Sequence, residues 1–133
     1  DNALKVETLM KSDESWFKAN SENGQADDDY IKILSMIKNG EFVKIISDGR
    51  IAGSFYIAFE GDYAGLYSLY IKQEFRRRGL GKQCISFMHD SAAKRGAGKL
   101  YLQVEADNKT AVALYEETGF ETAYNYIYYS KAH

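Results

Sequence analysis

Arg76-Arg77-Arg78-Gly79-Leu80-Gly81-Lys82 is the stretch that decides how this chain of 133 residues folds and what it binds. Four cations fall within seven residues, and two glycines remove side chains where a helix start presents unpaired N–H groups. Such N–H groups, together with the positive end of the helix dipole, cradle a pyrophosphate, and arginines contact a further phosphate. The turn therefore predicts a phosphate-binding site.

Two other phosphate-binding loops are excluded by the residues at fixed positions. The Walker loop requires glycine five positions before Gly81 and Ser or Thr after Lys82, where this chain has Arg76 and Gln83. The dinucleotide fingerprint requires a third glycine where this chain has Cys84. It also requires a parallel-strand unit before the glycines, which is not predicted here. The alternative for the turn taken alone is a solvated basic helix start.

Hydrophobic periodicity on both sides of the turn predicts the remaining elements. Strands are expected at 4–9, 42–46, 51–59, 65–71, 100–104 and 124–129, and helices at 12–20, 27–37, 79–95 and from 108 to a stop at Gly119. Asp48-Gly49 and Glu60-Gly61-Asp62 supply the turns between the middle strands. The predicted class is α/β, a mixed and mostly antiparallel central sheet flanked by about four helices.

The helix expected at 79–95 has the clearest pattern, because its apolar residues form one stripe and Gly96 stops it. The stripe consists of Leu80, Cys84, Ile85, Met88 and Ala92. In the helix at 27–37, Tyr30, Ile33, Leu34 and Ile37 have the same spacing. Cys84 is therefore expected in the core and not as a nucleophile.

Composition indicates a single globular domain spanning residues 1–133. The chain has 45% hydrophobic residues, no proline, and a net charge of -2, so bulk attraction to nucleic acid or anionic membrane is not expected. One cysteine permits no internal disulfide and no multi-cysteine zinc signature. His89 and His133 have no partner set for a metal, so none is expected.

The expected location is the cytoplasm. The single cysteine is compatible with a reducing compartment. No apolar run approaches the roughly 18 residues of a membrane span, and the first five residues lack the form of a signal peptide.

Two segments together resemble the GNAT superfamily of N-acetyltransferases. Arg76-x-x-Gly79-x-Gly81 after Leu69-Tyr70-Ile71 is similar to the acetyl-CoA-binding motif of that family. Residues 108–120 are similar to its downstream Asn-x-x-Ala-x-x-Leu-Tyr-x-x-x-Gly-Phe segment. The order of predicted elements agrees with the family from Glu41 to Tyr129.

The resemblance implies a GNAT-like fold and acetyl-CoA as co-substrate, without a metal. Backbone groups of Leu69, Tyr70 and Ile71 would hold the pantetheine arm and polarise the thioester carbonyl. The pyrophosphate would lie on Arg76, Arg77, Arg78, Gly79, Leu80, Gly81 and Lys82. Asn108 would contact the pantetheine arm or its water shell.

The resemblance implies Tyr115 as general acid, whereas Glu105 is a candidate general base because of its place at the end of the strand that leads to Asn108. A tyrosine hydroxyl can give a proton to a departing thiolate, and the attacking amine must lose a proton. Tyr115 also lies on an apolar helix stripe, so packing is the alternative role. Glu60, and behind it Asp62 and Asp107, are alternative bases.

The function implied is N-acetyl transfer to a primary amine of a small molecule or peptide, by direct attack in a ternary complex. A homodimer is compatible with this reading. Glu22 and the aspartates at 27–29 would favour a cationic acceptor, although N-capping of a helix is the favoured role of the aspartates. Trp16 and Phe17 would either line the acceptor site or pack in the core. Two alternatives are a catalytically silent CoA-binding sensor or interaction module, and a nucleotide-phosphate binder.

Overall fold

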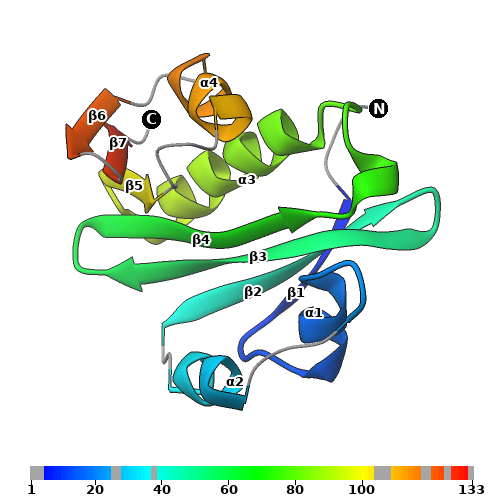
Figure 1. Ribbon diagram of the computed structural model, residues 1–133. Helices are drawn as coiled ribbons and strands as arrows, with labels where there is room; N and C mark the ends of the chain where they lie inside the picture. Colours follow the sequence, from blue (N-terminus) through cyan, green and yellow to red (C-terminus); the bar gives the residue numbers. More distant parts are fainter. Residues whose placement is uncertain are drawn as a thin grey trace.

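A mixed β-sheet forms the centre of the computed structural model, which describes residues 5–24, 28–36, 39–103, 109–117, 121–124 and 127–131. Within these residues the sheet has seven strands in the order β1-β2-β3-β4-β5-β7-β6 (Figure 1). The strands are β1 (Lys5–Leu9), β2 (Gly40–Ser47), β3 (Arg50–Glu60), β4 (Tyr63–Ile71), β5 (Lys99–Gln103), β6 (Glu121–Tyr124) and β7 (Ile127–Lys131). Only β4 and β5 are parallel neighbours, which confirms the mostly antiparallel sheet.

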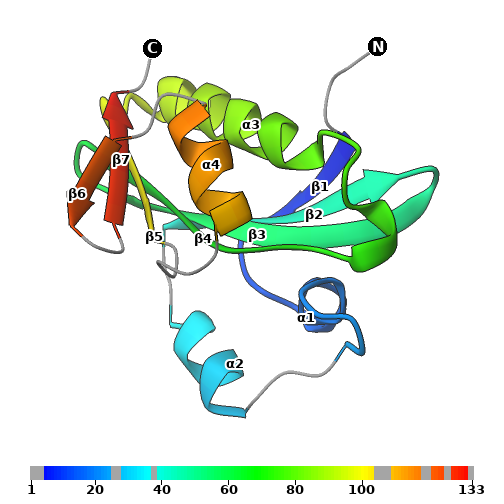
Figure 2. The same ribbon diagram turned by 45° about the horizontal axis from the view of Figure 1, so that its top comes forward.

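Helices cover both faces of the sheet. In the described part of the chain they are α1 (Glu14–Ala19), α2 (Asp28–Leu34), α3 (Leu80–Arg95) and α4 (Lys109–Glu117). α3 and α4 lie on one face, whereas α1 and α2 lie on the other (Figure 2). The four predicted helices are thus confirmed. None of the described helices is long and apolar enough to cross a membrane.

Two hydrophobic cores result from the alternation of side chains along the strands. The larger core lies under α3 and includes the whole predicted stripe, with Cys84, Met88 and Ala92 fully buried. Strand residues such as Phe55 and Leu102 complete it. The smaller core lies under α1 and α2 and consists of Trp16, Phe17, Leu34, Phe42 and Tyr56. The sheet is therefore packed on both faces.

Glycines in left-handed conformations begin and end α3. Gly79 precedes the helix with φ 78°, and Gly96 follows it with φ 75°. After Gly96, the amide of Ala97 donates to the carbonyl of Ala92 at 2.9 Å, which satisfies the last turn. The Asp48-Gly49 turn has positive φ at both residues, as a two-residue hairpin requires.

Two expectations from the sequence are wrong. α2 is only seven residues long; Leu34 enters the smaller core while Ile33 is 61% exposed, because so short a helix meets the sheet over a single turn. The single strand expected at 124–129 is instead two strands, β6 and β7, which pair antiparallel. No glycine or proline lies between the tyrosines, and Asn125 alone is a weak turn signal, so the reversal was not predicted.

Candidate functional site

The basic turn connects β4 to α3 through one 3-10 turn at Gln73–Phe75. Arg77 has φ 66°, an unusual value for a residue with a side chain, and Gly79 has φ 78°. The amide of Gln83 makes the first bond of the helix, to the Gly79 carbonyl at 3.2 Å. The amides before Gln83 therefore have no acceptor within α3, and this end of the helix can receive an anion.

Three of the four cations in the turn have protein partners at the surface. Arg76 donates to the carbonyl of Ile71 at 2.7 Å, Arg78 pairs with Asp48 at 2.9 Å, and Lys82 pairs with Glu117 at 2.5 Å. Arg77 is exposed and has no hydrogen bond or ion pair within the described residues. Exposed pairs contribute at most about 1 kcal/mol each, so a phosphate can displace them at small cost.

β4 and β5 separate at the point where the chain approaches the basic turn. Their parallel register covers four positions and ends with Leu66 opposite Leu102. β4 continues to Ile71, paired on its other side with β3. From Tyr67 onward, the β5-facing edge of β4 has no strand partner among the described residues. We call this opening the fork; an extended ligand can add to such an edge as a further strand does.

A β-bulge interrupts β4 at the start of the fork. Tyr67 pairs with Tyr56 and Tyr70 pairs with Ser54, so Ser68 and Leu69 both oppose Phe55. Ser68 has φ 56°, in the left-handed region. Beyond the bulge, Leu69 packs against the larger core. The sequence contains no glycine at this position and did not predict the bulge.

Tyr115 lies in the larger core, where it is 5% exposed. Burial raises the pKa of its hydroxyl to about 12, with a smaller contribution from the neighbouring Cys84. The side chain before it, Leu114, lies where a Cβ on Gly81 would come within 2.8 Å of its Cδ2 atom. α4 thus packs against the first turn of α3, so Tyr115 lies on the core side of the basic turn.

The candidate bases lie either at the far end of β4 from the basic turn or outside the described part of the chain. Glu105, Asp107 and Asn108 fall outside it. Glu60 and Asp62 lie at the opposite end of β4 from the basic turn (Figure 1). The nine residues of β4 rise by about 3.3 Å from each to the next, which separates the two ends of the strand by roughly 26 Å. Asp62 accepts from the amide of Gly98 at 2.7 Å, which explains its position structurally.

Glu22 reaches the site from the loop after α1, a contact that the sequence did not predict. Its carboxylate accepts from the hydroxyl of Tyr70 and from the amide of Gln73, and lies 3.9 Å from Arg76. The Tyr70 hydroxyl, followed by the Gln73 amide, lowers the pKa of Glu22. The negative charge of Glu22 therefore interacts with residues of the basic turn and its neighbours, and this argues against a role for Glu22 in binding a cationic acceptor.

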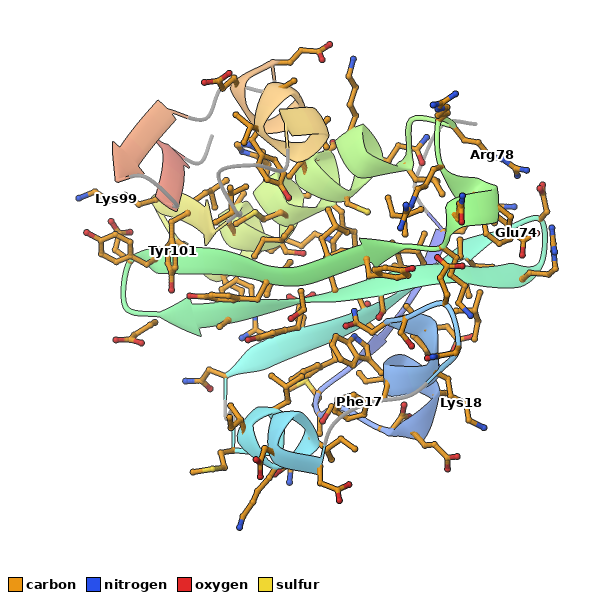
Figure 3. All side chains as sticks on the ribbon, viewed as in Figure 1. Phe17, Lys18, Glu74, Arg78, Lys99 and Tyr101 are labelled. Atoms are coloured by element: carbon orange, nitrogen blue, oxygen red, sulfur yellow. The ribbon has the colours of Figure 1, made fainter. Side chains whose placement is uncertain are left out.

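Aromatic residues line the sheet face opposite α3 at the fork. The Tyr67 hydroxyl donates to the Tyr101 hydroxyl at 2.8 Å, and burial followed by this bond raises the pKa of Tyr67. A Cβ on Gly65 would lie 2.5 Å from the Tyr101 ring, so glycine is required there. Figure 3 shows Tyr101 and Lys99 toward one end of the sheet and Arg78 and Glu74 at the other.

The side chains of Trp16, Phe17 and Cys84 pack in the two cores. Trp16 and Phe17 are buried in the smaller core, so packing accounts for both. Burial raises the pKa of Cys84 to about 12, which makes the thiol unreactive. Within the described residues, no group of three His, Cys, Asp or Glu side chains is placed to hold a metal.

Comparison with known proteins adds relatives of known activity. A [ribosomal protein bS18]-alanine N-acetyltransferase of Salmonella typhimurium is 36% identical over 81 residues, which cover 61% of this chain and 55% of the relative. A mycothiol acetyltransferase of Clavibacter michiganensis is 37% identical over 86 residues, covering 65% of this chain and 28% of that protein. The matching part thus spans about half of the first relative and less of the second.

Solved structures share the fold over nearly the whole chain. The ribosomal-protein-S18-alanine N-acetyltransferase of Escherichia coli superposes with a TM-score of 0.81 at 20% identity, covering 97% of this chain and 94% of that one. The paia N-acetyltransferase of Thermoplasma acidophilum, solved in complex with coenzyme A, gives 0.70 at 18% identity, covering 96% and 99%. Residues 6–120 match the family described as "Acetyltransferase (GNAT) family". The chain therefore belongs to the GNAT acetyltransferase family.

Proposed function

We propose that residues 1–133 form an acyltransferase domain that moves an acetyl group from acetyl-CoA to a primary amine. The observation that supports this most is the fork, because its unpartnered β4 edge leads directly to the basic start of α3. Acetyl-CoA has the matching parts in the matching order: an extended arm with amide groups, then a pyrophosphate. No other described edge leads to such an anion-binding end.

The donor would be held by backbone groups and cations together. Leu69, Tyr70 and Ile71 would bind the pantetheine arm along the β4 edge, and the amide of Leu69, which belongs to the bulge, would donate to the thioester carbonyl. The pyrophosphate would meet the amides at the start of α3 and the side chains of the basic turn. Asn108 remains the proposed second contact to the arm.

The reaction proposed is direct attack in a ternary complex. The lone pair of the amine nitrogen forms a bond to the thioester carbon, and the carbon–sulfur bond breaks. Tyr115 gives its proton to the leaving thiolate, while the nitrogen loses a proton to Glu105 or through water to solvent, from which Tyr115 is reprotonated. No covalent enzyme intermediate forms.

The raised pKa of Tyr115 is compatible with an acid role. A phenol with a pKa of about 12 is a weaker acid than an alkyl thiol, whose pKa is about 8.5 in water. Transfer is favourable only because the departing thiolate is itself taken from water, which raises its proton affinity in the same way. The phenol also remains protonated throughout the physiological pH range.

The acceptor proposed is an amine on a peptide terminus or a small molecule, and the location proposed is the cytoplasm. The relatives named above act on a ribosomal protein alanine in one case, and the name of the other specifies mycothiol. The rings of Tyr67 and Tyr101 offer an apolar surface with hydroxyl groups on the acceptor side of the fork. A homodimer is compatible with the proposal.

Calorimetry with acetyl-CoA, CoA and ATP tests the donor. We expect acetyl-CoA and CoA to bind with similar affinity and ATP at least about tenfold more weakly, because ATP has no arm for the β4 edge. Equal affinity for ATP would indicate a general phosphate site. No binding of acetyl-CoA would disprove the proposal.

A screen of thiol release from acetyl-CoA over amino acids, polyamines, small amines and peptides with different first residues tests the transfer. Turnover that requires the amine, with an acetylated product by mass spectrometry, is the expected result. Donor binding without turnover for every acceptor would instead favour a CoA-binding sensor.

A further inference from the structure

The bulge in β4 changes which face each later residue of the strand occupies. Before it, Tyr67 lies beside Tyr56 on the aromatic face of the sheet. Strict alternation would put Leu69 on that same face. The extra residue reverses the alternation, so Leu69 and Ile71 pack against the larger core while Tyr70 meets Glu22.

The bulge requires support because its conformation is unfavourable for serine. Ser68 has φ 56°, where a Cβ is crowded by its own backbone. A regular strand would relieve that strain by moving Ser68 back to negative φ. Such a shift would also turn the backbone amides and carbonyls of the fork by one residue.

Asn20 provides the support from the end of α1. Its side-chain amide donates to the Ser68 carbonyl at 2.8 Å and to the Ser54 hydroxyl at 2.8 Å. Ser54 is fully buried, and its hydroxyl donates a hydrogen bond to the Trp16 carbonyl at 3.2 Å. The Trp16 indole donates to the Phe55 carbonyl at 2.9 Å, directly opposite the bulge. Both strands at the bulge are therefore held from one short helix.

We infer that Asn20 is a positioning residue for acetyl transfer, which acts by holding the Ser68 carbonyl and so fixing the bulge that aims the Leu69–Ile71 backbone into the fork. The inference rests on the proposed acetyl transfer for its effect on catalysis. Its effect on the strand does not depend on that function. If the backbone amide that would bind the thioester carbonyl is displaced, the rate of acetyl transfer should fall more than the affinity for acetyl-CoA, because most of the donor contacts lie in the basic turn.

The test compares Asn20→Ala with Asp13→Ala and with the double variant Asn20→Ala/Ser68→Gly. Asp13→Ala removes the cap at the other end of α1 and leaves the bulge contacts in place. Ser68→Gly makes positive φ acceptable without the clamp. We expect Asn20→Ala to lower kcat by roughly tenfold or more with a smaller change in KM for acetyl-CoA, Asp13→Ala to leave kcat unchanged, and Asn20→Ala/Ser68→Gly to recover most of the lost rate.

Hydrogen–deuterium exchange over residues 63–71, in the absence of ligand, gives a readout that requires no activity. Faster exchange in Asn20→Ala but not in Asp13→Ala supports the inference even if no acceptor is turned over, in which case only the proposed function fails. Unchanged exchange, or a loss of rate that Ser68→Gly does not restore, overturns it. If Asn20→Ala does not fold, Asn20→Asp, which keeps the size but presents oxygens to the Ser68 carbonyl, replaces it with the same expectations.

Discussion

Tyr115 is the residue at which burial and chemistry are most closely joined. Its ring is 5% exposed and packs with the core under α3, while the same burial raises the pKa of the hydroxyl. Removing the hydroxyl while keeping the ring separates the two contributions. The proposed acid role and the packing role therefore make different predictions for one substitution.

Tyr115→Phe is expected to lower kcat by roughly 100-fold, the usual range for loss of a general acid, with acetyl-CoA affinity within about twofold of wild type. Steady-state kinetics and calorimetry check this, with thermal unfolding to verify that the core is kept. Since the pKa of Tyr115 is about 12, wild-type activity should not decline through loss of this proton below about pH 10. A variant as active as wild type would leave Tyr115 only its packing role.

Gly53 is a second residue whose identity is fixed by close contact. A Cβ there would lie 2.0 Å from the carbonyl oxygen of Tyr70, a backbone atom that cannot move without shifting β4. We expect Gly53→Ala to reduce the free energy of unfolding by at least about 3 kcal/mol. Gly49→Ala, where φ is 73° but nothing lies within 4 Å, should cost only about 1 kcal/mol. Denaturant unfolding of both variants checks the difference, and equal losses would show that the Tyr70 contact is not responsible.

The sequence could predict the residues that act through local pattern and not those that act across strands. The basic turn, the Cys84 stripe and Tyr115 are each visible within one helix or one motif. Asn20, Ser68 and Gly53 act through partners 48, 48 and 17 or 18 positions away, which appear only once β3 and β4 are in register. A serine in an alternating strand gives no sign of positive φ.

At the scale of elements, α1 shows how a helix of six residues is stabilised. Asp13 accepts from the Trp16 amide at 2.8 Å and from the Ser15 hydroxyl at 2.7 Å, and the Asn20 amide donates to the Phe17 carbonyl at 3.0 Å at the other end. The side-chain bond from Ser15 contributes most to lowering the pKa of Asp13 below its usual 3.8, against a partial opposing effect of burial. The cap is therefore most effective when Asp13 is charged.

Asp13→Ala should destabilise the protein by about 1 kcal/mol at neutral pH. Because the folded pKa of Asp13 is lowered, the charged cap stabilises the fold above pH 3.8, and the stabilisation is lost as the pH falls through the lowered pKa. The difference in Tm between wild type and variant should then be constant from neutral pH to about pH 4 and shrink below it. Asp13→Asn, a cap that does not titrate, is the control. A difference that stays constant at low pH would contradict the assignment.

Element types were predictable where one period persists over several turns, as in α3. Element types were less predictable where contacts with other parts of the fold determine how a segment folds. Leu34 of α2 is buried whereas Met36, two residues later, is 70% exposed, and the tyrosines near the end of the chain suit one long strand as well as β6 and β7. In both cases the deciding factor is which partner the segment meets, and not its own pattern.

At the scale of the whole molecule, the local charge of the basic turn is opposite in sign to the net charge of the chain. The chain carries -2 overall, yet four cations are concentrated in one turn at one end of the sheet. Donor binding should therefore depend on local attraction, which salt screens over about 8 to 10 Å at physiological ionic strength. Raising NaCl from about 50 to 500 mM should weaken acetyl-CoA binding several-fold.

Arg77→Ala tests the same point without changing the solvent. This exposed cation has no ion pair or hydrogen bond in the part of the chain that the structure describes. Its loss should weaken acetyl-CoA binding by up to about fivefold and reduce the salt dependence. Lys94→Ala, which removes an exposed cation from the last turn of α3, should do neither. An equal effect of the two substitutions would indicate that only overall charge matters.

The separation of β4 from β5 also bears on how long the protein survives. From Tyr67 to Ile71, the β5-facing edge of β4 meets no strand among the described residues, so a donor bound there would add to the sheet as well as entering the reaction. Occupancy at 100 times the dissociation constant would add about 2.7 kcal/mol to the free energy of unfolding. The protein should accordingly resist proteolysis for longer when acetyl-CoA is abundant. A starved cell would then degrade it faster than a well-fed one.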